Sequence, residues 1–184
     1  MKDLYKIAAQ CIQEVYDGNC YNIDSSEYNI FMRTYKKEPI LVLAIGGTDE
    51  RKDWWINFDL RAAEGIKIGA YNEAINIRKH LLEKKMLNKN FRLLVTGHSK
   101  GGPSAIAWKR LFGADWCVAF APARSLRYHI DRNMDNTTLF IDPDDPVTKV
   151  GWLFFGHPKC HRIESKDNHI LPSISDHMMY HWHQ

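Results

Sequence analysis

The sequence predicts an α/β protein built on a mostly parallel central sheet with helices on both faces. Short apolar runs recur along the chain, and they are nearly continuous rather than alternating, which is typical of strands covered on both faces. Segments whose apolar residues have helical spacing separate these runs. The 184 residues contain no linker-like stretch. We therefore expect one compact domain over residues 1–184.

Each expected element follows from a local pattern. A first helix is expected over 3–15, where apolar residues recur at helical spacing behind Asp3, a residue suited to the N-cap. Strands are expected over 28–36 and 40–45, the second ending at Gly46-Gly47. The same patterns predict helices over 70–87, 100–112 and 171–183, and strands over 91–96, 116–121, 137–142 and 159–164.

The composition excludes several classes of protein. With 25 basic and 22 acidic residues, scattered along the chain, the net charge of +3 is too small to predict nucleic-acid binding. The N-terminus lacks the apolar core of a signal peptide, and no segment reaches the roughly 20 apolar residues that a membrane span needs. We therefore expect a cytoplasmic protein without stable membrane insertion.

The cysteines indicate thiols rather than a metal site. They stand at positions 11, 20, 117 and 160 and lack CxxC spacing, which argues against structural zinc. Four reduced thiols fit a cytosolic protein, and a Cys11–Cys20 bridge remains the alternative.

Residues 97–101, Gly-His-Ser-Lys-Gly, match the pattern G-x-S-x-G. They join an expected strand to an expected helix, the context in which this pattern marks a nucleophilic serine. Side chains at 97 and 101 would collide with the neighbouring strand and helix, and the backbone N–H of Lys100 is placed to stabilise an oxyanion. His98 is interpreted as a packing residue. The alternative is an ordinary turn capped by Ser99; a phosphate loop is excluded because G-x-x-x-x-G-K-[ST] does not occur.

A second segment, "LVLAIGGTDERKDWWINFD" at 41–59, carries a family resemblance. An apolar strand ends in Gly-Gly-Thr and is followed by Asp-Trp and Asn. With the serine motif, this resembles the class 3 lipases, α/β-hydrolases of the fungal triacylglycerol lipase type. Segments 66–74 and 120–124 resemble two more family segments in the same order, with Lys67 in place of a His and Ala121 in place of a Gly. The resemblance implies an α/β-hydrolase fold.

The resemblance to the class 3 lipases also implies a catalytic triad in the chain order Ser, Asp, His, with Ser99 as the nucleophile. Thr48 resembles the oxyanion-hole residue, acting together with Lys100. For the acid, Asp145 fits the family pattern Asp-x-Val, whereas Asp142 stands directly at a strand end and remains the alternative. For the base, His177 fits best. Other late histidines are His169, His181 and His183.

The expected reaction is hydrolysis of a small-molecule or lipid carboxylic ester through an acyl-enzyme, with no cofactor and no metal. Little sequence is left for a long lid, so we expect a minimal one, with Trp54 and Trp55 either at the substrate rim or packed under the loop. A thioesterase, amidase or acyltransferase on the same fold, a metal site formed by the late histidines, and a non-catalytic binding protein are the alternatives. The oligomeric state stays open.

Overall fold

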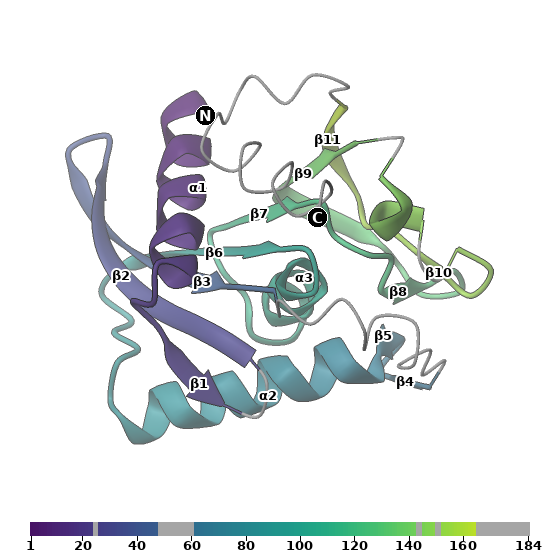
Figure 1. The fold of residues 1–184 in the computed structure, drawn as a ribbon, viewed down its shortest axis with the longest axis horizontal. Helices are drawn as coiled ribbons and strands as arrows, with labels where there is room; N and C mark the ends of the chain where they lie inside the picture. The colour runs from purple at the N-terminus through teal and green to yellow at the C-terminus, as the bar shows by residue number, and fades with distance from the viewer. Residues whose placement is uncertain (24–25, 48–60, 143–144, 150–151, 165–184) are drawn as a thin grey trace.

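The structure is a computed structural model that describes residues 1–23, 26–47, 61–142, 145–149 and 152–164. Its centre is a seven-stranded sheet in the order β1-β2-β3-β6-β7-β9-β11 (Figure 1). These strands are β1 (Tyr21–Ile23), β2 (Ser26–Tyr35), β3 (Glu38–Ile45), β6 (Arg92–His98), β7 (Trp116–Phe120), β9 (Asn133–Ile141) and β11 (Lys159–Glu164).

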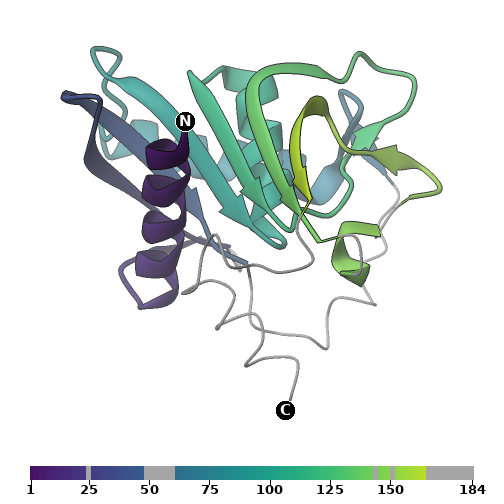
Figure 2. The same cartoon turned by 90° about the horizontal axis from the view of Figure 1, so that it is seen from above.

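The sheet is mostly parallel, which confirms the prediction. β3, β6, β7, β9 and β11 run parallel to one another, whereas β2 pairs antiparallel with β3 and β1 with β2. The carboxyl ends of the five parallel strands therefore share one edge, where the arrowheads of β6 and β7 meet in Figure 2. Polar residues that follow these strands are brought together at this edge.

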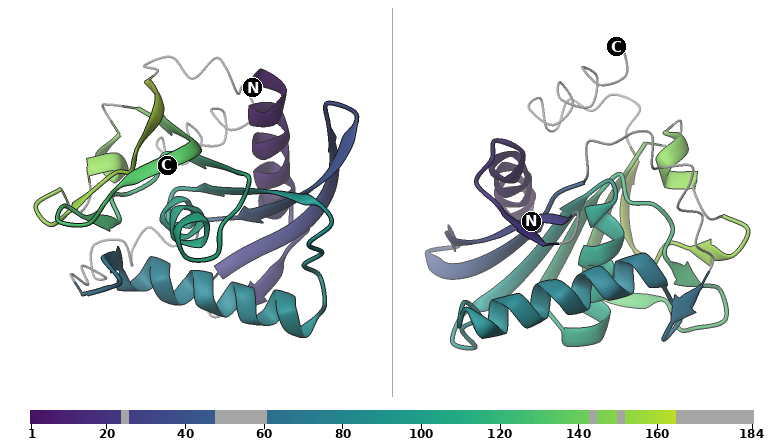
Figure 3. Two further views of the ribbon diagram at one scale, coloured as in Figure 1. Left: turned by 180° about the vertical axis from the view of Figure 1, so that it is seen from behind. Right: turned by 60° about the horizontal axis from the view of Figure 1, so that its bottom comes forward.

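Helices cover both faces of the sheet, as predicted (Figures 1 and 3). On one face, α1 (Lys2–Tyr16) buries Ile12 and Val15 against Val42 and Ala44 of β3. On the other, α2 (Ile68–Glu83) and α3 (Gly101–Phe112) bury a second apolar cluster. Its large, fully buried side chains include Tyr28, Leu43, Ile77, Leu81 and Trp108. Burial of these two faces is the main stabilising contribution to the layered fold.

Two elements differ from their prediction by four residues at one end. α2 ends at Glu83 rather than 87, because Lys85 adopts a left-handed backbone (φ 54°) and the Met86 N–H donates to the Leu81 carbonyl. This arrangement closes a helix and satisfies its last carbonyls. β9 begins at Asn133 rather than 137, because the segment before Thr137 also pairs with β11.

A small second sheet was not predicted. It has the order β10-β8-β5-β4, formed by β10 (Phe155–Gly156), β8 (Leu126–Arg127), β5 (Ile66–Lys67) and β4 (Ala62–Ala63). Strands of two residues are too short to show the alternation by which strands are recognised. The three-residue β1 was missed for the same reason, and the helix expected over 171–183 lies outside the described residues.

The four thiols are free, so Cys11 and Cys20 form no bridge. Burial raises the pKa of the Cys11 and Cys117 thiols to about 12, which keeps both protonated and unreactive. Across the described part of the chain, no helix has the length and apolar character needed to cross a membrane.

Candidate active site

Ser99 occupies a strained turn between β6 and α3. Its backbone is left-handed, with φ 53°, a conformation that non-glycine residues seldom adopt and that costs about 1 kcal/mol or more. Its N–H donates to the Phe120 carbonyl of β7 (2.9 Å), and its carbonyl accepts from the Gly102 N–H (3.2 Å). α3 begins at Gly101, two residues beyond Ser99, so its partially positive end lies beside the serine. The side chain is partly exposed.

The two motif glycines permit this turn. A Cβ on Gly97 would lie 2.2 Å from the Gly101 carbonyl oxygen, and a Cβ on Gly101 would lie 2.3 Å from the carbonyl oxygen of Ile45 in β3. Both separations are far inside van der Waals contact, and both partners are backbone atoms. The expected collision of side chains at 97 and 101 with the adjoining strand and helix is thus confirmed.

Tyr16 links the end of β3 to the serine turn. Its hydroxyl oxygen accepts a hydrogen bond from the Gly47 N–H (2.9 Å) and lies 2.6 Å from Nδ1 of His98. A Cβ on Gly47 would be 3.2 Å from the Cβ of Ser99, so the two loops nearly touch. His98 is therefore hydrogen-bonded as well as packed. No local pattern indicates a role for Tyr16, because its contact with His98 joins residues 82 positions apart.

The two candidate acids follow β9 in one loop. Asp142 comes directly after the strand, and the Asp145 N–H donates to its carbonyl (3.2 Å). Oδ1 of Asp145 accepts from the Val147 N–H (2.8 Å) and so caps the 3₁₀ helix Pro146–Lys149. Burial raises the pKa of the Asp145 carboxyl above its usual range. A carboxylate has two oxygens, so one can cap a turn while the other orients an imidazole.

Thr148 stabilises this acid loop through hydrogen bonds of its hydroxyl and its carbonyl. Its hydroxyl donates to the Asp145 carbonyl (2.9 Å), and its own carbonyl lies within hydrogen-bond distance of His157 Nε2 (3.1 Å) and Arg124 Nε (3.3 Å). Burial lowers the pKa of His157 to about 4, so its ring is neutral and Nε2 is the donor. Sequence reasoning missed Thr148 and His157, whereas Arg124 lies in a segment that carries the lipase resemblance.

The order of the strands brings the two loops to one edge. Ile45 pairs with Gly97, and His98 pairs through Phe120 with Phe140 of β9. Adjacent strands lie about 4.8 Å apart, so the end of β3 is one strand from the serine turn and the end of β9 is two, or about 10 Å. An imidazole with a hydrogen bond on each side bridges a gap of this order.

Several predicted residues fall outside the part of the chain that the structure describes. These are Thr48, Trp54, Trp55 and His177, together with the alternative histidines His169, His181 and His183. Their roles, and the minimal lid expected between β3 and α2, stay predictions. Lys100 is described and directly follows Ser99, the position expected of an oxyanion-hole N–H.

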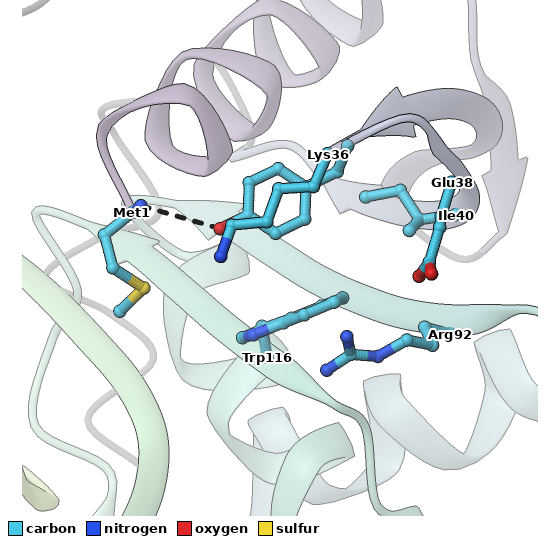
Figure 4. Close-up of a pocket in the computed structure, with 7 residues that line it drawn as sticks. Met1, Lys36, Glu38, Ile40, Arg92 and Trp116 are labelled. Carbon is cyan, nitrogen blue, oxygen red and sulfur yellow. Dashed lines mark hydrogen bonds between the residues drawn. The ribbon is translucent and has the colours of Figure 1, made fainter.

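A cavity of about 480 Å³ lies at the opposite edge of the sheet (Figure 4). Ile40, Arg92 and Trp116 line it near the amino ends of β3, β6 and β7, and Arg92 stands over the Trp116 ring at 3.8 Å. Because β6 extends from Arg92 to His98, the length of that strand, roughly 20 Å, separates this cavity from Ser99. It is therefore not the candidate active site.

Comparison with known proteins supports the fold. No protein-family model matches the chain, and no curated protein matches its sequence. Among solved structures, a fungal lipase determined as an inhibitor complex matches with a TM-score of 0.52 and 13% identity, covering 84% of this chain and 75% of the lipase chain. The chain has a lipase-like fold. At this identity the match shows architecture alone, so membership of the class 3 lipases stays a prediction.

Proposed function

We propose that the protein is a serine hydrolase that cleaves carboxylic esters through an acyl-enzyme on Ser99. The observation that carries this proposal is the left-handed backbone of Ser99 between a parallel strand and a helix. A serine that merely capped the helix would have no need of this strain. The strain is instead useful for projecting a hydroxyl from the carboxyl edge of the sheet.

The proposed reaction uses a triad of Ser99, His177 and Asp145. His177 takes the proton of the Ser99 hydroxyl as the oxygen attacks the ester carbonyl, while Asp145 holds the other ring nitrogen. The backbone N–H groups of Thr48 and Lys100 stabilise the oxyanion. The alcohol leaves with the proton from His177, and water then hydrolyses the acyl-enzyme by the same proton transfers. These steps need no cofactor.

The proposed substrate is a small-molecule or lipid ester bound within one domain over 1–184, with Trp54 and Trp55 at its rim. Thioester, amide or acyl-transfer chemistry would proceed through the same acyl-enzyme, and substrate profiling separates these reactions. The lipase-like fold supports hydrolysis of an ester in preference to the others.

Replacing the nucleophile tests the proposal. Ser99→Ala should lower turnover of a p-nitrophenyl ester by about 10⁴-fold or more, because the acyl-enzyme cannot form. Ser125→Ala is the matched control, since the Ser125 hydroxyl is buried without a hydrogen-bond partner among the described residues. Equal turnover in the two variants would refute the proposed nucleophile.

The choice of acid has its own test. Asp145→Asn should lower turnover by about 10⁴-fold, because an amide cannot stabilise the imidazolium and favours the wrong ring tautomer. Asp142→Asn should lower it less than about tenfold, an indirect effect through the loop. The reverse ranking would assign the acid to Asp142 and leave the serine mechanism intact.

A further inference from the structure

The cavity at the amino edge of the sheet has the features of a small-molecule site. Its volume of about 480 Å³ falls within the range of roughly 300–1,000 Å³ that is usual for such sites. Buried apolar side chains line it, namely Tyr35, Ile40 and Trp116. Lys36 lies on one side, at the turn between β2 and β3, and Arg92 faces it across the cavity (Figure 4). The proposed hydrolysis uses none of these residues.

Arg92 is fixed in position while its terminal nitrogens stay available. The guanidinium carbon lies 3.8 Å from the centre of the Trp116 ring, and Nε donates to Oδ1 of Asp115 (3.0 Å). Oδ2 of Asp115 accepts from the Leu93 N–H (2.8 Å), so the backbone holds this carboxylate in turn. The Nη groups of Arg92 form no hydrogen bond with the described residues. A guanidinium held in this way is preorganised to pair with a planar oxyanion.

Two further donors at the cavity have no acceptor. The indole N–H of Trp116 has no hydrogen-bond partner in the described part of the chain, and the Tyr35 ring packs edge-on against the indole, with 5.5 Å between ring centres. The Lys36 ammonium lies 5.5 Å from the centre of the Tyr35 ring and pairs with no described carboxylate. Donors therefore exceed acceptors at the cavity, so a matching ligand supplies hydrogen-bond acceptors.

The charges around the cavity are mixed. Of the lining residues, Lys36 and Arg92 are cationic, and Glu38 is an exposed anion without an ion pair to any described residue. The charged residues within three positions of the lining residues along the chain are Lys2, Asp3, Arg33, Lys37, Lys89 and Asp115. Of these, Asp115 pairs with Arg92, and Arg33 pairs with Glu14. The positive excess is small, and Glu38 opposes a ligand with more than one negative charge.

We propose that this cavity binds a small carboxylic acid with an apolar body, in its carboxylate form. The carboxylate accepts hydrogen bonds from the Arg92 Nη groups and pairs with the Lys36 ammonium, while the apolar body covers Ile40 and Tyr35. A carboxylate fits better than a phosphate, because it carries a single charge and matches the planar guanidinium. The length of β6 separates the cavity from Ser99, so this binding goes beyond the proposed hydrolysis and does not depend on it.

A site-resolved titration tests the proposal, with phenylpropionate as the probe and the full chain at pH 7. The signal of the Trp116 indole N–H in proton–nitrogen NMR spectra, identified by its loss in Trp116→Phe, should shift and saturate with a Kd of about 1 mM or below. Phenylpropanol has the same apolar body without the charge and should bind at least about tenfold more weakly. Phenylpropylamine, which carries a positive charge, should bind more weakly still.

Variants of the charged lining residues sharpen the test. Arg92→Gln should weaken phenylpropionate binding about tenfold, and Lys36→Gln, in an exposed turn where folding is not at risk, about threefold. Glu38→Gln should tighten it about twofold, because a repulsive charge is removed. The matched control is Arg78→Gln, whose guanidinium lies over the Phe112 ring on the α2 side and should bind as the wild type does.

Other results overturn the proposal. A Trp116 signal that does not shift, equal binding of the alcohol or the amine, or equal binding by the Arg92→Gln and Arg78→Gln variants would show that the cavity does not recognise a carboxylate. Ser99→Ala should bind phenylpropionate unchanged, and a loss there would assign the probe to the proposed active site. A protein that binds the probe at Trp116 but hydrolyses no ester would support the cavity and refute the proposed function, so the two failures are distinguishable.

Discussion

Left-handed backbone occurs both where the strands of the central sheet begin (the amino edge) and where the parallel strands end (the carboxyl edge), but the structural reason differs. At the amino edge, Lys36 and Lys37 (φ 51° and 68°) form the two-residue turn between β2 and β3. Such hairpins require positive φ at both central residues. At the carboxyl edge, Ser99 (φ 53°) and Ala121 (φ 44°) are left-handed without any hairpin, and each comes directly after a parallel strand.

The amino and carboxyl edges also differ in how closely they are packed. Near the amino edge, Arg92 forms a half-exposed ion pair with Asp115 (3.0 Å), and a cavity remains open beside Trp116. At the carboxyl edge, Gly97 and Gly101 permit backbone contacts that no other residue would allow. The close backbone packing thus lies where the reaction is proposed, beside a left-handed serine that no hairpin requires, which is the arrangement expected of a preorganised site.

The largest expected effect comes from filling the close contact at the carboxyl edge. Gly101→Ala places a Cβ 2.3 Å from the Ile45 carbonyl oxygen, so we expect a loss of about 4 kcal/mol or more in the free energy of unfolding, measured by urea denaturation. The control is Gly69→Ala, where no atom lies within 4 Å of the added Cβ. That helical change should stabilise the protein by up to about 1 kcal/mol. Equal effects would contradict the close packing.

The next largest effect is expected on the pH dependence of the free energy of unfolding, through His157, which supports the acid loop. Its pKa of about 4 in the folded protein lies below the 6.5 of an exposed imidazole, so the unfolded chain binds more protons between these values. The stabilisation is full above pH 6.5 and is lost as the pH falls to 4, by about 3 kcal/mol. Denaturation at pH 7, 5.5 and 4 should show this loss in the wild type.

His157→Gln should remove that part of the pH dependence. The raised pKa of Asp145 acts in the opposite sense, but it is common to both proteins and cancels in the comparison. His161→Gln, at an exposed position, serves as the control. A His157→Gln curve that parallels the wild type would show that His157 is not buried in its neutral form.

A smaller effect is expected at Tyr16, which we infer to be a positioning residue for the proposed oxyanion loop. Tyr16→Phe removes the acceptor of the Gly47 N–H, so kcat should fall about tenfold while KM stays within about twofold. Tyr35→Phe, near the amino edge, should change neither. A change confined to KM, or none, would show that this contact supports the fold only.

The sequence predicted the parts of this fold that rest on local chemistry. Nearly continuous apolar runs predicted β3, β6 and β7, and the spacing of Gly97, Ser99 and Gly101 predicted a sharp turn from strand to helix. Ala121 is informative too. By the resemblance to the class 3 lipases it replaces a Gly, and its left-handed backbone explains why a Gly is suited to that position.

The parts that were missed depend on contacts between distant segments. The hydrogen bonds of Tyr16 and Thr148 join loops that only the sheet order brings together, and no local pattern encodes them. The strands of the second sheet are too short to have a period. The late histidines offer identical chemistry at neighbouring positions, so spacing alone cannot rank them.

Labelling with a fluorophosphonate probe tests the central claim most directly. The folded protein should take up one probe per chain, on Ser99, and should lose the reaction both in Ser99→Ala and in wild-type protein unfolded in urea, because only the folded turn activates the hydroxyl. Folded protein that stays unlabelled, or that carries the probe on another residue, would contradict the account.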